Sequence, residues 1–206
     1  MSDDRRAPLS RDVIVERARA LISEHGLDAL TLRRLADDLS VSATALYAHV
    51  TDKEDLLRAV AESEFDVLMA RYEEIDATPG STRPLERIRE QFRTYVRRCR
   101  EDPELFRVMF LFPPALGELT DAPAGAELPA ATKAFTMAVG AIDDAIAAGE
   151  LRATDSLTVA LSMWAGAHGV ASLLLLGLAP SPDAQEALVT EVADRILGGY
   201  GATHQS

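Results

Sequence analysis

The stretch from Thr31 to Lys53, TLRRLADDLSVSATALYAHVTDK, limits what this chain can fold into more than any other stretch. In its first part, apolar residues recur at the spacing of one helix face: Leu32, Leu35, Ala36 and Leu39. Thr31 precedes them, and its hydroxyl can accept a hydrogen bond from a backbone N–H at the helix start. The apolar pattern stops at residues 40–42, so the sequence predicts a short helix followed by a turn.

A second short helix is predicted directly after that turn. Ser42 can cap it, and Leu46 and Val50 would hold it against the core. Two short helices joined by a short turn form a helix-turn-helix, whose second helix can enter the major groove of DNA. The side chains that it would expose are small or hydrogen-bonding, which suits close approach to base edges: Ala43, Thr44, Tyr47, Ala48 and His49. The pattern alone does not require DNA, because many helical hairpins bind none.

Three segments here also resemble a known family. LADDLSVS (35–42), ALYAHV (45–50) and DKEDLL (52–57) are similar to the DNA-binding domain of tetracycline-repressor-type (TetR family) regulators. The likeness runs from about Arg11 to Leu57, and LYAHV is most similar to the tetracycline repressors themselves. Ser40 departs from the family, which usually has glycine in this turn. If that residue is left-handed, serine costs roughly 1–2 kcal/mol relative to a relaxed conformation.

The resemblance implies roles for single residues. Arg33 would read a base, with guanine as the natural bidentate target of its guanidinium, although Arg34 beside it is an alternative and Arg33 could be a plain surface charge. Hydroxyl, imidazole and ammonium groups would mainly fix the DNA backbone, and small side chains would face the groove. The expected DNA-binding residues are Thr31, Arg33, Ser42, Ala43, Thr44, Tyr47, His49 and Lys53.

The charge is acidic and uneven. The chain has 21 basic and 33 acidic residues, a net charge of −12. Residues 1–58 hold 9 of the basic and 11 of the acidic residues, so most of the negative charge lies in the remainder. This argues against a generic nucleic-acid coat and predicts few phosphate contacts, hence a shallow dependence of DNA affinity on salt.

The rest of the chain predicts an all-α protein, because strand-like alternation is rare and helix-forming residues dominate. We expect a helix-turn-helix DNA-binding domain at 1–52 and a helical-bundle ligand-binding and dimerisation domain at 53–206. A helix at about 53–74, capped by Asp52, would link them. Other helices are predicted from Ser10 to the stop at Gly26, and at about 85–101, 103–112, 130–148 and 182–197, with loops at 76–83 and 117–129.

The segment Leu157–Ala179 is apolar apart from hydroxyls and His168, and is long enough to be a membrane-span candidate. Acidic flanks and the lack of a basic edge favour a helix buried by its own domain and a partner, so we expect no membrane contact. The family resemblance implies that this helix and the last one form half of a four-helix homodimer interface. The single cysteine, Cys99, and the charged residues 1–12 favour a cytoplasmic location.

Motifs of enzymes are missing. The sequence has no phosphate-binding glycine loop, no Gly-x-Ser-x-Gly elbow and no metal-spaced Cys/His pairs. The adjacent Asp143 and Asp144 would point in different directions on a helix. We therefore expect no enzymatic activity, no cofactor and no metal.

A small-molecule site is expected in the second domain. Trp164 and His168 share a helix face, where they are either core residues or the wall of a cavity with His168 as its polar group. The other candidates are apolar residues at helical spacing, which could equally be plain core. The full expected set is Phe92, Tyr95, Phe106, Met109, Phe110, Phe135, Trp164 and His168.

These features predict a homodimeric transcription repressor that binds double-stranded, pseudo-palindromic operator DNA. A small apolar or amphipathic effector would release it by shifting the linking helix. The alternative is a helical carrier of a lipid or other hydrophobic molecule, whose helix-turn-helix is only a structural hairpin. The match at Thr31–Lys53 discriminates between them, because a carrier gives no reason for it.

Overall fold

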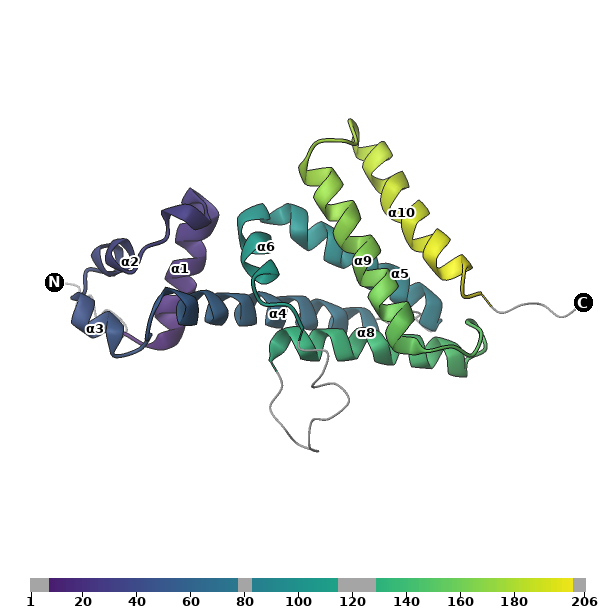
Figure 1. Ribbon diagram of the computed structural model, residues 1–206, viewed down its shortest axis with the longest axis horizontal. Coiled ribbons are helices and arrows are strands. Elements are labelled where there is room, and N and C mark those ends of the chain that lie inside the picture. Colours follow the sequence, from purple (N-terminus) through teal and green to yellow (C-terminus); the bar gives the residue numbers. More distant parts are fainter. Residues whose placement is uncertain (1–7, 78–82, 115–128, 202–206) are drawn as a thin grey trace, which may run out of the picture. The chain divides into compact units, whose positions relative to one another are not determined.

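The computed structural model describes residues 8–77, 83–114 and 129–201. In these ranges the chain is helical, and the one β pairing is an isolated bridge between Leu151 and Gly201, which confirms the predicted all-α class. The elements are α1 (Arg11–His25), the 3₁₀ turn η1 (Leu27–Ala29), α2 (Leu32–Leu39), α3 (Ala43–Tyr47), α4 (Lys53–Ala77), α5 (Pro84–Glu101), α6 (Pro103–Phe110), α8 (Ala130–Ala147), α9 (Ser156–Leu175) and α10 (Pro182–Gly198) (Figure 1).

The helices pack into two compact units. The first comprises residues 1–64 with 104–112, and the second comprises 65–103 with 113–206. Helix α4 therefore contributes its first half to one unit and its second half to the other. The units follow packing rather than chain order, so the domain limits 1–52 and 53–206 remain a proposal. Most of the expected loop at 117–129 lies outside the described residues.

The core of the first unit is built from α1, α2, α3 and the start of α4. Ser10 caps α1 by accepting a hydrogen bond from the Val13 N–H (3.3 Å), and Gly26 ends it with a φ of 85°. Fully buried residues from each helix meet in one cluster: Ile14, Ile22, Leu35, Leu46, Leu56 and Val60.

Helix α6 completes this first core from the middle of the chain. Its Leu105 and Val108 are buried in the same cluster. The Glu104 carboxylate at its start accepts a hydrogen bond from the Leu27 N–H (2.8 Å), just after Gly26. A Cβ at Gly26 would meet that carboxylate at 3.4 Å, an ordinary contact, so it is the positive φ that favours glycine here.

In the second unit α5 packs against α8, α9 and α10. Most of its arginines pair with acidic residues of the same helix or of neighbouring segments, including Arg89 with Asp194 of α10 (2.7 Å) and Arg87 with Asp144 of α8. Each pair contributes little stability by itself because the charges are partly solvated. These ion pairs explain why α5 is rich in arginine, so its basic side chains do not indicate a nucleic-acid site.

Helix α9 begins at Ser156, capped by Asp155, and ends at Leu175. The apolar segment thus continues beyond the helix into a turn, where Gly177 has a φ of 73°. Among the described residues, α9 is the one helix long and apolar enough to cross a membrane. Core helices of globular proteins pass the same test, and α9 packs on three neighbouring helices, α5, α8 and α10.

Candidate DNA-binding surface and effector cavity

The turn between α2 and α3 is fixed by hydrogen bonds at both ends. The Thr31 hydroxyl accepts from the Arg34 N–H, and the Ser42 hydroxyl accepts from the Ala45 N–H, each at 3.1 Å. Both predicted caps are therefore present. Between them Ser40 is left-handed (φ 55°, ψ 44°). This conformation is strained for serine, whereas the glycine usual in the family would adopt it freely.

The strain at Ser40 is offset by the way in which α2 ends. The Ser40 N–H donates to the Asp37 carbonyl (3.1 Å), and the Val41 N–H donates to the Ala36 carbonyl (3.0 Å). This pair of bonds is a Schellman motif, which satisfies carbonyl groups that a helix end otherwise leaves unpaired.

Helix α3 ends at Tyr47, before Val50. The chain continues as a turn in which the Val50 N–H donates to the Leu46 carbonyl (3.2 Å), and Val50 is buried without being helical. The outer face of α3 carries the expected residues in the open: Ala43, Thr44, Tyr47 and Ala48 are exposed, while His49 is half-buried.

An arginine from α1 holds the end of this motif in place. Arg11 Nη1 donates to the His49 carbonyl (2.7 Å), and its Nη2 donates to Asp55 Oδ1 (2.6 Å). The Asp55 carboxylate also accepts from the Thr51 N–H (2.8 Å). Arg11 and this N–H together lower the pKa of Asp55 to about 2.

The sequence analysis did not predict the Arg11–Asp55 ion pair, called the Arg11–Asp55 brace below. Asp55 stands in the DKEDLL segment, but its partner lies 44 residues earlier, and no local pattern connects the two.

The basic residues of the first unit divide into paired and unpaired groups. Arg17 pairs with Asp38, Arg19 pairs with the buried Glu64, and Arg58 pairs with Glu54. In contrast, the exposed Arg33 and the half-buried Lys53 have no hydrogen-bond or ion-pair partner within the described ranges. The exposed Arg34 also has no ion-pair partner within the described ranges, so both arginines are available to DNA.

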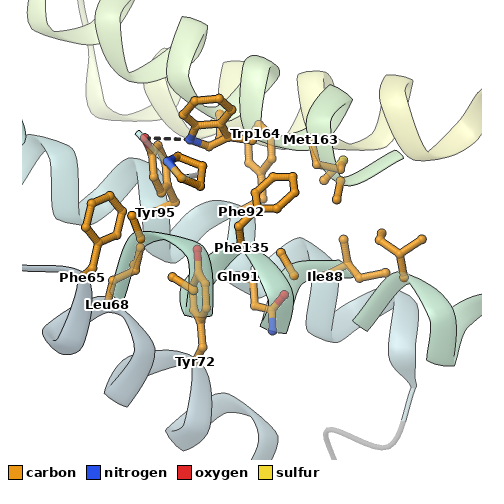
Figure 2. Close-up of a pocket in the computed structure, with 17 residues that line it drawn as sticks. Phe65, Leu68, Tyr72, Ile88, Gln91, Phe92, Tyr95, Phe135, Met163 and Trp164 are labelled. Carbon is orange, nitrogen blue, oxygen red and sulfur yellow. Dashed lines mark hydrogen bonds between the residues drawn. The ribbon is translucent and has the colours of Figure 1, made fainter. Parts of the chain in front are cut away.

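The second unit contains a partly open cavity lined by residues of α4, α5, α8 and α9 and by Pro114 (Figure 2). It offers about 70 Å³ to the centres of water-sized spheres, several times the roughly 10–15 Å³ that one water needs. Four of the residues expected at a ligand site line it: Phe92, Tyr95, Phe135 and Trp164. The Trp164 indole N–H donates to the Tyr95 hydroxyl (3.3 Å), and the Phe135 ring meets Trp164 edge-on.

The other four expected residues are not part of the cavity lining. Phe106 and Met109 are buried on α6, and Phe110 on the same helix is 42% exposed, its ring 5.0 Å from that of Phe106. His168 lies one turn beyond Trp164, with its Nε2 3.5 Å from the Ser172 hydroxyl, and burial lowers its pKa.

The cavity lining also includes residues that the sequence pattern did not single out. Phe65, Leu68 and Tyr72 enter from α4, Gln91 from α5 and Met163 from α9. A weak signal was present for Gln91, because it interrupts an apolar helix face between Ile88 and Phe92. Among the described residues, none that lines the cavity carries a charged side chain. Among the described residues no cluster of His, Cys, Asp and Glu could hold a metal ion.

A separate apolar surface lies at the end of α9. Leu173 (41% exposed), Leu175 (40%), Leu176 (73%) and Leu178 (66%) lie near one another in sequence in this region. By contrast, the exposed residues of α10 are mostly polar or charged, such as Glu186, Glu191 and Arg195.

The chain thus combines a unit that carries a capped helix-turn-helix and unpaired cations with a second unit that contains an apolar cavity. This combination defines a class of protein: a DNA-binding transcriptional regulator with a ligand-binding domain. Comparison with sequence profiles of known families supports this class. The profile of bacterial regulatory proteins of the tetR family matches residues 14–60, and that of the tetracyclin repressor-like C-terminal domain matches residues 88–196. The chain belongs to the TetR family of DNA-binding transcription regulators, which are not enzymes.

Individual proteins are also similar to this chain. An uncharacterized HTH-type transcriptional regulator of Mycobacterium tuberculosis is 26% identical over 195 residues, covering 95% of this chain and 83% of that protein. The class D tetracycline repressor of Escherichia coli is 42% identical over 55 residues, 27% of this chain and 25% of that protein. A protein of unknown function from Rhodococcus sp. RHA1 has a similar structure, with a TM-score of 0.77, 27% identity, and coverage of 97% of this chain and 100% of the other.

Proposed function

We propose that this protein is a homodimeric repressor that binds a pseudo-palindromic operator and is released by a small apolar or amphipathic effector. The observation that supports it best is the helix-turn-helix on which Arg33 and Lys53 are left without partners while Arg11, Arg17, Arg19 and Arg58 are paired. The class D tetracycline repressor, similar in this region, is by its name a repressor. Such a function places the protein in the cytoplasm.

Base reading is assigned to Arg33 and the α3 face. A guanidinium that no carboxylate neutralises is free to donate to guanine O6 and N7. Lys53, at the first position of α4, supplies a phosphate contact, as do the hydroxyls of Thr31, Ser42 and Tyr47 and the imidazole of His49. Ala43, Thr44 and Ala48 bring methyl groups to the groove, where thymine methyls are the matching surface.

Dimerisation is assigned to α9 and α10. The exposed leucines at the end of α9 form an apolar surface that a second copy would remove from water. The two recognition helices of a dimer must sit about one helical turn apart, ~34–36 Å. A shift of several ångströms in their spacing prevents both from binding at once.

Effector binding is assigned to the cavity. Its lining from α4 includes Phe65, Leu68 and Tyr72, and the same helix continues back to Lys53 in the first unit. A ligand that favours one position of this helix would change DNA affinity by its difference in affinity for the two states. His168 stays a proposed polar contact, reached if the neighbouring Trp164 moves with the ligand.

Sequencing of DNA fragments selected by the purified full chain tests this function. We expect an inverted repeat whose half-sites lie about one helical turn apart. Recovery of sequences without a shared motif, from a folded protein that binds apolar molecules, would favour the hydrophobe carrier instead.

A further inference from the structure

Two polar side chains line the cavity without a hydrogen-bond partner in the part of the chain that the structure describes. They are Gln91 of α5, 5% exposed, and Tyr72 of α4, 6% exposed. Polar groups of mostly buried side chains are nearly always hydrogen-bonded in native proteins, so a molecule inside the cavity is a natural partner for these two. The nearby Tyr95 differs, because its hydroxyl already accepts a hydrogen bond from Trp164.

The chemistry of these two groups defines what they can bind. A glutamine amide both donates and accepts hydrogen bonds, and so does a tyrosine hydroxyl. Burial raises the pKa of Tyr72, so this hydroxyl stays protonated and neutral. Because none of the described lining residues is charged, a charged ligand would lose its hydration without gaining a counter-ion from them.

We propose that Gln91 and Tyr72 determine the specificity of the cavity, by hydrogen-bonding the hydroxyl or carbonyl group of an uncharged and otherwise apolar ligand. The proposal rests on the proposed function only in taking this cavity as the effector site. In Figure 2 the Tyr72 ring rises from its helix with the hydroxyl pointing toward the middle of the lining residues. A ligand held there is bonded directly to α4, the helix that both units share.

Trp164 provides a direct assay, because it is the single tryptophan of the chain and lines the cavity. Fluorescence titration of the full-length protein with phenol, toluene and benzoate compares three ligands with one ring and different substituents. We expect phenol to bind more tightly than benzoate. Gln91→Leu and Tyr72→Phe should each lower the ratio of phenol affinity to toluene affinity by roughly two- to tenfold, the range for one neutral hydrogen bond.

Met163→Leu is the matched control, because it changes an apolar lining residue at nearly constant volume. This variant should keep the wild-type ratio. Thermal unfolding without ligand gives a second measurement: Gln91→Leu removes an unpaired buried amide and should raise the melting temperature by about 2–4 °C. A glutamine with a purely structural role would give a lower melting temperature instead.

An unchanged ratio in both variants, tighter binding of benzoate than of phenol, or no saturable binding of phenol would each overturn the proposal. DNA selection by the same variants separates this outcome from failure of the proposed function. Gln91→Leu should select the same DNA as the wild type, since Gln91 lies outside the helix-turn-helix. If the wild type selects no DNA but the affinity ratios shift as expected, the regulator function fails and the ligand specificity stands.

Discussion

All residues expected to contact DNA lie between Thr31 and Lys53. The cavity is instead lined by side chains that range from Phe65 to Ala167, from four helices and Pro114. The DNA-binding surface depends on caps, a turn and ion pairs at the exterior. The cavity depends on burial, and its described lining is mostly apolar, so its few polar groups can determine which ligand binds. Evolution can therefore change the effector without disturbing the DNA-binding surface, and the following experiments test that separation.

The largest effect is expected at the dimer surface. Leu176→Glu would place a charge in the proposed seam, and a buried unpaired charge costs about 3–5 kcal/mol. Light scattering should show a monomer that has lost operator binding, while Trp164 fluorescence still reports phenol binding. Ala147→Glu, an exposed change at the end of α8, is the control and should leave the dimer intact. If the wild-type protein is a monomer at micromolar concentration, the predicted homodimer is wrong.

The second-largest effect is expected from a cavity made in the core of the first unit, which should weaken DNA binding without affecting ligand binding. Leu46 is fully buried, and Leu46→Ala should cost about 2–5 kcal/mol in that unit. Hydrogen exchange should show faster opening of α1 to α3, and DNA affinity should fall. Phenol titration of Trp164 should be unchanged. Equal loss of phenol binding would show that the units do not act separately.

Arg33 and Lys53 distinguish base reading from backbone contact. Arg33→Ala should cost roughly 1–3 kcal/mol per half-site and relax the preference at one base pair, whereas Lys53→Ala should weaken all sequences alike. Binding to operator and mismatched DNA at two salt concentrations measures both, and the wild-type salt dependence should be shallower than that of a repressor with about ten phosphate contacts. If Arg33→Ala weakens every sequence equally, Arg33 contacts phosphate rather than bases.

Relief of strain in the turn should give a smaller change of opposite sign. Ser40→Gly removes a left-handed serine and should stabilise the first unit by roughly 1–2 kcal/mol, less the cost of a more flexible unfolded chain. Chemical denaturation measures it. Ser40→Ala, which keeps a Cβ, should show no gain, and a gain of equal size there would mean that strain is not the cause.

The Arg11–Asp55 brace should give the smallest effect, up to about 1 kcal/mol, because both side chains are partly exposed. The pKa of Asp55 is lowered to about 2 in the folded protein, below its ordinary value of 3.8. Its contribution is therefore present above pH 4 and is lost as the pH falls from about 4 to 2. Asp55→Asn should flatten the stability profile in this window, and an unaltered profile would show that the brace adds no stability.

The sequence alone was sufficient for the caps at Ser10, Thr31 and Ser42, the helix-turn-helix and the approximate positions of the main helices, because each depends on residues a few positions apart. It misplaced several helix ends: α3 stops before Val50, α9 ends at Leu175 and α4 continues to Ala77. It also predicted Phe92, Tyr95, Phe135 and Trp164 as cavity candidates, but not which aromatic residues would be plain core.

Tertiary packing decided the rest. Periodicity shows which face of a helix is apolar, but not which helix will cover it. Only the assembled fold places α6 in the first core, pairs Arg11 with Asp55, and leaves Gln91 and Tyr72 facing one apolar space. These groups come from segments far apart in the chain, and their meeting depends on helix packing that no local pattern encodes.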